Sequence, residues 1–209
     1  MWTVPRTTVE PGQQAPDFTL PAADREGTVS LAEYRGRPVL LTLFRGLYCP
    51  FCRHQIARLA TTAEKLRAPG VETLGVVATA ADRARLYFRY RQARIPLAAD
   101  PDLVTHRAYG VPGIPVTEEL GQALDEIALR FAREQGLAAT PGTAHKDINA
   151  IDGYQPTAED QAEFDRHQAQ LTAQFLIDRQ GVVRWSNVER APSQFPSDAE
   201  LLATVTARG

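Results

Sequence analysis

The chain contains only two cysteines, Cys49 and Cys52, which stand three positions apart in the stretch Cys-Pro-Phe-Cys. Two thiols at this spacing can bind a metal, form a structural disulfide, lie inert in a core or act as a redox pair. A zinc site takes about four ligands, and the four histidines are not spaced as zinc ligands are. A disulfide between such close residues removes little entropy from the unfolded chain. The pattern predicts a redox pair and no metal, with inert core thiols as the alternative.

A helix is expected to begin directly after the first cysteine. Residues 39–44 are apolar at nearly every position, which is typical of a strand buried on both faces of a sheet. Pro50 suits the first position of a helix, so Cys49 would be its N-cap, where free amide groups and the helix dipole favour a thiolate. Cys52, one turn further on, would be more buried. We therefore expect Cys49 to attack and Cys52 to resolve by closing a disulfide.

Other side chains near Cys49 are candidates for supporting its thiolate. Arg45 and Arg53 would add positive charge near the sulfur, which favours the charged form. His54 lies about one turn after Cys49 and could tune the thiolate or transfer a proton, with a surface histidine in the same helix as the alternative. Pro50 completes this set, because it would place the start of the helix next to the sulfur.

The elements that position this pair alternate between strand and helix. The helix that starts at Pro50 ends at Pro69-Gly70, and a second buried strand begins at Val71. The later patterns predict a helix over 81–93, a strand over 95–99, a helix over 102–109, strands over 174–178 and 181–187 joined by a turn, and a helix over 197–207. A βαβ half followed by a ββα half is thioredoxin-like connectivity. The predicted fold class is therefore α/β, with a mostly parallel central sheet flanked by helices.

A long segment, at about 112–173, separates the two halves and exceeds the usual length of a connection. Apolar residues at helical spacing predict a helix over 120–132, and a capping-box pattern at 157–160 predicts another that runs through Leu171. Residues 140–156 are expected to form an exposed loop. We interpret residues 1–209 as a single domain with a helical insertion, which could be a lid over the thiols, a surface for a homodimer, or a segment packed on its own domain.

Composition and charge narrow the classes of partner. With 44% hydrophobic residues, 23% charged residues and a net charge of -2, the chain resembles an ordinary globular protein and predicts neither nucleic acid nor an acidic membrane as partner. No apolar run has the length of a signal peptide core or a membrane span, so the cytoplasm is the expected compartment. Five arginines between Arg83 and Arg94 could dock an acidic redox partner or an anionic substrate, although a solvated helix face is the favoured interpretation.

Three stretches, at 12–55, 95–111 and 174–187, together resemble the alkyl hydroperoxide reductase / thiol-specific antioxidant group, the peroxiredoxin-like redoxins. The resemblance covers most of residues 10–111 and 174–188 and leaves the insertion unmatched. It implies a thioredoxin fold and the reduction of peroxides by a cysteine at the start of a helix. That cysteine corresponds to Cys49.

The sequence also departs from the pattern of this group. The group carries Pro-x-x-x-Thr-x-x-Cys, and here Thr42 and Gly46 stand in place of the proline and the threonine. The activating arginine of the group would fall at Thr172, which is also about where thioredoxins place a cis-proline. Cys-Pro-Phe-Cys is similar to the glutaredoxin motif, and Tyr48 stands where thioredoxins have tryptophan.

The resemblance and the thiol pair together imply a thiol-dependent oxidoreductase without a cofactor. In the preferred hypothesis, Cys49 reduces hydrogen peroxide or an organic hydroperoxide and then forms a disulfide with Cys52. An external dithiol of the thioredoxin, glutaredoxin or glutathione type restores both thiols. One alternative is a thiol-disulfide reductase that acts on protein or glutathione disulfides. Another is a redox sensor without catalytic activity.

Overall fold

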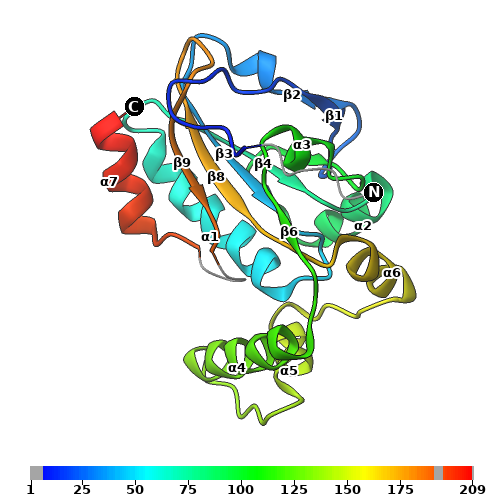
Figure 1. Ribbon diagram of the computed structural model, residues 1–209. Coiled ribbons are helices and arrows are strands. Elements are labelled where there is room, and N and C mark those ends of the chain that lie inside the picture. The colour runs from blue at the N-terminus through cyan, green and yellow to red at the C-terminus, as the bar shows by residue number, and fades with distance from the viewer. Residues whose placement is uncertain (1–6, 191–194, 209) are drawn as a thin grey trace.

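A five-stranded mixed sheet forms the centre of the molecule (Figure 1). The structure is a computed structural model that describes residues 7–190 and 195–208. The sheet has the order β5-β4-β3-β8-β9, in which β3, β4 and β5 are parallel and β8 and β9 run antiparallel to their neighbours. The strands span Val39–Phe44 (β3), Glu72–Val77 (β4), Leu97–Ala99 (β5), Ala173–Ile177 (β8) and Val183–Val188 (β9). This arrangement confirms the predicted thioredoxin-like class.

The apolar run of β3 explains why this strand lies at the centre. All six of its residues are buried, and they divide between two cores because successive side chains point to opposite faces. Leu40 and Phe44 belong to the core under the helices, whereas Leu41 and Leu43 belong to the core on the other face. The strand is thus held from both sides and fixes the loop that follows it.

Helices cover one face of the sheet, and the N-terminal segment with a short helix covers the other (Figure 1). On the first face lie α1 (Pro50–Leu66), α2 (Ala81–Tyr90) and α7 (Asp198–Arg208). On the second lie β1 (Thr19–Pro21), β2 (Thr28–Ser30), a 3-10 helix (Leu31–Tyr34) and α3 (Val104–Ala108). The ranges of α1, α2, α3 and α7 agree with the predicted helices, apart from shorter ends for α2 and α3, whereas the sequence analysis predicted no element for the segment that holds β1, β2 and the 3-10 helix.

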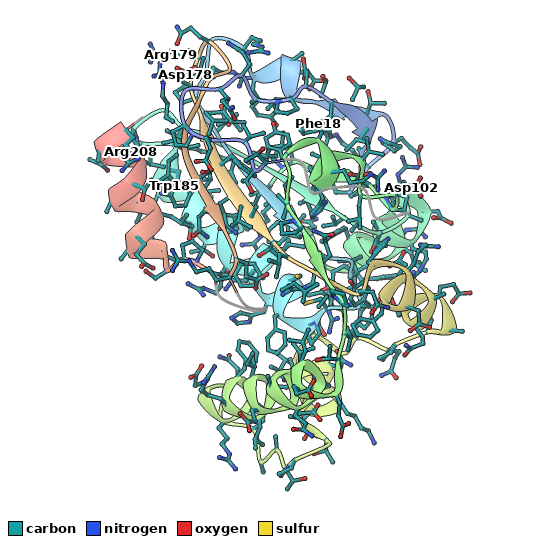
Figure 2. All side chains as sticks on the ribbon, viewed as in Figure 1. Phe18, Asp102, Asp178, Arg179, Trp185 and Arg208 are labelled. Atoms are coloured by element: carbon teal, nitrogen blue, oxygen red, sulfur yellow. The ribbon has the colours of Figure 1, made fainter. Side chains whose placement is uncertain are left out.

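The predicted C-terminal hairpin and closing helix are confirmed. Figure 2 shows Asp178 and Arg179 at the turn between β8 and β9, and Trp185 further along β9. Trp185 packs on the core under the helices. The hydroxyl of Ser197 accepts a hydrogen bond from the amide of Glu200, and the Ser197 amide donates one to the Glu200 carboxylate. Ser197 is therefore the N-cap of α7.

The insertion holds three helices, α4 (Glu118–Glu134), α5 (Ala144–Asp152) and α6 (Ala158–His167). In Figure 1, α4 and α5 lie together at one end of the molecule, and α6 lies between them and α2. A two-stranded sheet, β6 (Gly113–Ile114) and β7 (Ala169–Gln170), joins the two ends of the segment. Within the described residues, no helix is both long and apolar enough to cross a membrane. The interpretation as one domain with an insertion stays a prediction.

Two predictions for the insertion were wrong. Residues 140–156, expected as a loop, contain α5, whose buried Ala144 and Ile148 stand one turn apart. This helix of nine residues is too short to be stable alone, so it forms because of its packing contacts. The many turn-forming residues in this stretch favoured the prediction of a loop. The helix expected to reach Leu171 ends at His167, because Gln168 takes a left-handed φ of 55° and the chain then enters β7.

Candidate active site

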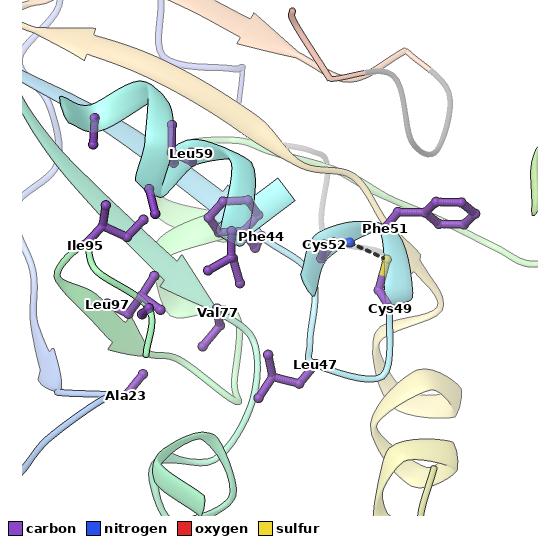
Figure 3. Packing of buried hydrophobic residues seen from close by; sticks show 14 of the residues in the cluster. Ala23, Phe44, Leu47, Cys49, Phe51, Cys52, Leu59, Val77, Ile95 and Leu97 are labelled. Atoms are coloured by element: carbon purple, nitrogen blue, oxygen red, sulfur yellow. Dashed lines mark hydrogen bonds between the residues drawn. The ribbon is translucent and has the colours of Figure 1, made fainter. Parts of the chain in front are cut away.

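Cys49 is the N-cap of α1, as the proline after it predicted. Its backbone is extended, with φ -82° and ψ 110°, and its Sγ accepts a hydrogen bond of 3.4 Å from the amide of Cys52 (Figure 3). Pro50 occupies the first turn, where its missing N–H leaves no bond unmade. The sulfur therefore faces the free amides and the positive end of the helix dipole, both of which favour a thiolate.

The two thiols are free and differ in environment. Cys49 is 6% exposed, and Cys52 is completely buried. Burial by itself raises the pKa of Cys49, but the hydrogen bond with the Cys52 thiol and the charge and hydrogen bond of Arg45 outweigh it and lower this pKa to about 5. Burial and the neighbouring Cys49 sulfur raise the pKa of Cys52 well above its ordinary value. The pair thus holds one thiolate and one thiol at neutral pH.

Arg45 supplies the positive charge next to the sulfur. Its side chain is buried in the loop between β3 and α1, and its Nε donates to Cys49 Sγ at 3.4 Å. Its Nη1 donates to the carbonyl oxygen of Gln170 at 3.0 Å and to Glu189 Oε2 at 2.8 Å. Burial alone would lower the pKa of Arg45, but the two cysteines and Glu189 raise it, so the guanidinium keeps its charge.

Glu189 is a site residue that the sequence reasoning missed. It follows β9 directly and is buried. Besides Arg45, its Oε2 accepts hydrogen bonds from the amide of Thr172 at 2.9 Å and from the Thr172 hydroxyl at 3.1 Å. The pairing of Ala173 with Val188 places Thr172 opposite Glu189. A reading of the hairpin register could therefore have found this carboxylate.

The structure also gives a physical reason for Gly46 at the position of the missing threonine. A Cβ atom at Gly46 would lie 2.6 Å from the ring of Tyr48 and 3.0 Å from the carbonyl oxygen of Ala78. The Tyr48 ring fills this space and packs edge-on against Phe164 of α6, with ring centroids 5.8 Å apart. A threonine at position 46 would therefore require the Tyr48 ring to move in this backbone.

Arg53 is turned toward the insertion. Its Nε donates to Asp152 Oδ2 at 2.6 Å and its Nη2 to Asn149 Oδ1 at 2.7 Å, while its Nη1 donates to the carbonyl oxygen of Leu47 at 2.7 Å. The guanidinium carbon also lies 3.9 Å from the ring centroid of Tyr154. All three nitrogens of Arg53 therefore link the first turn of α1 to α5 and to the loop before Cys49.

His54 packs edge-on against Phe131 of α4, with ring centroids 5.0 Å apart. Burial and the charge of Arg58 lower the pKa of His54, so the ring is neutral at pH 7. The structure therefore brings Arg45 and Pro50 to the sulfur and directs Arg53 and His54 to the insertion. A role of these four residues in supporting the thiolate stays a prediction.

A cavity of about 370 Å³ borders Cys49. The part of the chain outside the insertion, called the body below, contributes Arg45, Tyr48, Pro50 and Phe51 to its lining. The insertion contributes the opposite wall, made mainly of Leu124, His145, Asn149, Gln161 and Phe164. The insertion therefore forms part of the surroundings of the thiol, and any molecule that reaches Cys49 through this cavity contacts it.

Comparisons with known proteins identify a family that this chain matches. The model of the AhpC/TSA family matches residues 11–186. A Mycobacterium tuberculosis protein provisionally named a peroxiredoxin is 31% identical over 107 residues, which cover 51% of this chain and 68% of that protein. Peroxiredoxin Q of Triticum aestivum, described as chloroplastic, is 29% identical over 105 residues, which cover 50% of this chain and 48% of that protein.

Two solved structures share the fold. The reduced 2-Cys peroxiredoxin of Plasmodium vivax superimposes with a TM-score of 0.62 at 18% identity and covers 97% of this chain and 82% of its own. A Chlorobium tepidum protein provisionally named the thiol:disulfide interchange protein DsbE gives a TM-score of 0.56 at 21% identity, over 95% and 99% of the two chains. The family match extends from before β1 into β9 and includes both cysteines. The chain belongs to the AhpC/TSA family.

Proposed function

We propose that this chain is a thiol-dependent peroxidase in which Cys49 is the peroxidatic residue and Cys52 the resolving one. The observation that carries the proposal is the thiolate environment of Cys49, whose pKa is lowered to about 5 beside Arg45, at the edge of a cavity. The thiolate, not the thiol, is the nucleophile in such chemistry. At neutral pH this sulfur is therefore ready to react.

In the first step, the Cys49 thiolate attacks one oxygen of the peroxide and the O–O bond breaks. The sulfur gains a hydroxyl group and becomes a sulfenic acid, and the leaving oxygen takes up a proton and departs as water or an alcohol. Arg45 is suited to this step, because its charge stabilises the thiolate and can also stabilise the negative charge on the leaving oxygen.

In the second step, the Cys52 sulfur attacks the sulfenic acid, an S–S bond forms and water leaves. Residues three apart at the start of a helix lie within the roughly 4.4–6.8 Å between Cα atoms that a disulfide spans. The existing hydrogen bond from the Cys52 amide to Cys49 Sγ supports this closeness. The buried Cys52 has a raised pKa and stays protonated until the sulfenic acid forms.

An external dithiol of the thioredoxin, glutaredoxin or glutathione type then reduces the disulfide and regenerates both thiols. A reducing compartment such as the cytoplasm is the proposed setting, because such reductants are maintained there. The substrate reaches Cys49 through the cavity that the insertion helps to line.

A second candidate function is a thiol-disulfide reductase that uses the same two cysteines. The observation in its favour is Gly46, because no threonine hydroxyl is available at this position to hold a peroxide. The Tyr48 ring occupies the space that the Cβ of a threonine would need. In this reaction Cys49 would attack a disulfide of the substrate, and Cys52 would release the mixed disulfide.

Stopped-flow oxidation of the reduced protein tests the two functions. Wild type, Cys49→Ser and Cys52→Ser are each mixed with hydrogen peroxide, with cumene hydroperoxide, and with an oxidised glutathione or peptide disulfide, and the products are identified by mass. Rapid oxidation by a peroxide that requires Cys49 and ends in a Cys49–Cys52 disulfide supports the peroxidase. Rapid exchange only with disulfides supports the reductase. Slow reactions with both contradict both functions and leave a redox sensor.

A further inference from the structure

A second cavity, of about 520 Å³, lies between the body and the insertion. Its walls are mostly apolar and come from four helices, with Ile56 and Phe88 on the body and Phe131, Ile148 and Ile151 on the insertion. Ile151 is 47% exposed although it is a large apolar residue. The volume falls within the range of roughly 300–1,000 Å³ that is usual for sites of small molecules.

The cavity is lined by more positively charged than negatively charged side chains. It is lined by three guanidinium groups, Arg53, Arg91 and Arg94, and by one carboxylate, Asp152. Arg53 and Asp152 neutralise each other at 2.6 Å. Within residues 7–190 and 195–208, neither Arg91 nor Arg94 forms an ion pair. Arg91 donates to the backbone oxygen of Asp152 and lies 5.2 Å from the centroid of the Tyr87 ring.

The arginines between Arg83 and Arg94 differ in whether they form ion pairs. Arg83 pairs with Asp160 at 2.5 Å and with Glu163 at 3.1 Å, and Arg85 pairs with Glu26 at 3.1 Å. These two arginines are engaged in holding the fold. Arg91 and Arg94, by contrast, line the cavity, and neither forms an ion pair with a carboxylate in the described part of the chain.

The backbone at Arg94 adds an independent observation. Its φ of 58° is left-handed, a conformation that is unfavourable for a residue with a side chain. The neighbours Ala93 and Ile95 are both buried, whereas Arg94 is exposed. Such backbone strain is found preferentially at binding sites, and here it accompanies an exposed guanidinium at the edge of an apolar cavity.

We propose that this cavity binds a small amphipathic carboxylate, such as the anion of a medium-chain fatty acid. The apolar tail would lie against the walls given by α1, α2, α4 and α5, and the carboxylate would bind Arg91 and Arg94. The site is distinct from the cavity at Cys49, and Pro50 borders both. The proposal does not depend on the reaction at Cys49, because binding is measured directly.

Displacement of a fluorescent fatty-acid probe, dansyl-undecanoate, by decanoate tests the proposal, at concentrations below those at which either compound forms micelles. Decanol is the matched ligand without the charge. The double variant Arg91→Gln/Arg94→Gln removes the proposed partners of the carboxylate. Arg89→Gln is the matched control, because Arg89 is an exposed arginine near the end of α2, close to Arg91 in sequence, and does not line the cavity.

We expect decanoate to displace the probe from wild type and from Arg89→Gln equally well. The double variant and the use of decanol should each weaken binding about tenfold or more, since each removes a charged hydrogen bond. Ile151→Ser, a change at a half-exposed position that should leave the fold intact, should also weaken it. Absence of displaceable probe binding, or equal affinity of wild type and the double variant for decanoate, would overturn the proposal.

Discussion

Glu189 Oε2 lies 2.8 Å from Arg45 Nη1, and both side chains are almost completely buried. The carboxylate comes from the end of β9 and the guanidinium from the loop after β3, so 144 positions of the chain separate them. The pair leaves Nε of Arg45 directed at Cys49 Sγ. The charge that acts on the thiolate is therefore held in place by a residue that follows β9, far from Arg45 in sequence.

Replacing Arg45 with methionine should raise the pKa of Cys49 from about 5 toward its ordinary value. The variant loses both the positive charge and the hydrogen bond at the sulfur, and it leaves the charge of Glu189 nearby. The pKa is measured from the ultraviolet absorbance of the thiolate in the Cys52→Ser background, with Arg53→Met as the comparison. An unchanged pKa in Arg45→Met would exclude the proposed role of this arginine.

The lowered pKa of Cys49 should appear as a dependence of stability on pH. The pKa is about 5 in the folded state and near 9.0 in an ordinary cysteine, so the unfolded state binds more protons between these values. The contribution of the thiolate to stability is complete above about pH 9 and is lost as the pH falls toward 5.

Urea unfolding of the reduced protein at several pH values between 5.5 and 8 measures this effect against Cys49→Ser. The free energy of unfolding of wild type should rise with pH relative to that of the variant. A difference that stays constant over this range would mean that Cys49 has an ordinary pKa.

Glu189→Ala should lower the free energy of unfolding by about 3–5 kcal/mol, because it leaves the Arg45 cation buried without its carboxylate. The double variant Arg45→Met/Glu189→Met should recover most of this loss, since it buries no charge. Glu72→Ala is the control: Glu72 pairs with Arg37 at the surface, and removing such a pair costs at most about 1 kcal/mol. Equal losses for Glu189→Ala and Glu72→Ala would contradict the prediction.

The contact between Arg53 and Asp152 should control access to Cys49, because it links α1 to the insertion that lines the thiol cavity. Asp152→Asn removes the charge and nearly conserves the shape. A bulky maleimide should then alkylate Cys49 several-fold faster than in wild type, while a small reagent such as iodoacetamide changes less. Asp125→Asn is the control, because its contact with His145 at 3.6 Å is exposed. Equal acceleration of both reagents would indicate a change in thiol reactivity instead.

Restoring the threonine of the family should damage this protein. In Gly46→Thr the new Cβ would lie 2.6 Å from the Tyr48 ring, and such overpacking typically costs about 1–3 kcal/mol. The double variant Gly46→Thr/Tyr48→Ala should fold more stably than expected from the sum of the two single changes. Urea unfolding of the four proteins measures this coupling, and simple additivity would show that the two side chains do not compete.

The sequence was sufficient for the parts of the site that depend on local rules. The apolar run of β3 and the proline after Cys49 predicted a buried strand and a helix whose N-cap is Cys49, and the structure has both. Each of these features depends on residues that are close along the chain. The thiol pair follows from the same local geometry.

The remaining features depend on contacts between distant segments. Arg53 has the same charge as Arg45 and is as close to Cys49 in sequence, yet its nitrogens bind Asp152 and Asn149, almost a hundred positions later. Glu189 reaches the site only through the register of β8 and β9. No local pattern encodes these partners, so the sequence alone could not show that Arg45 turns to the sulfur while Arg53 turns to the insertion.

The pairing of β6 with β7 has a consequence for how such proteins can diversify. Because Gly113 faces Gln170, the chain leaves the body and returns to it at adjacent points. The entropic cost of closing a loop grows only slowly with its length. The length of this segment can therefore change at little entropic cost, provided that its contacts with Arg53 and with the core under the helices are kept. Chains with the same pairing could in this way carry segments of different length over the same central strands.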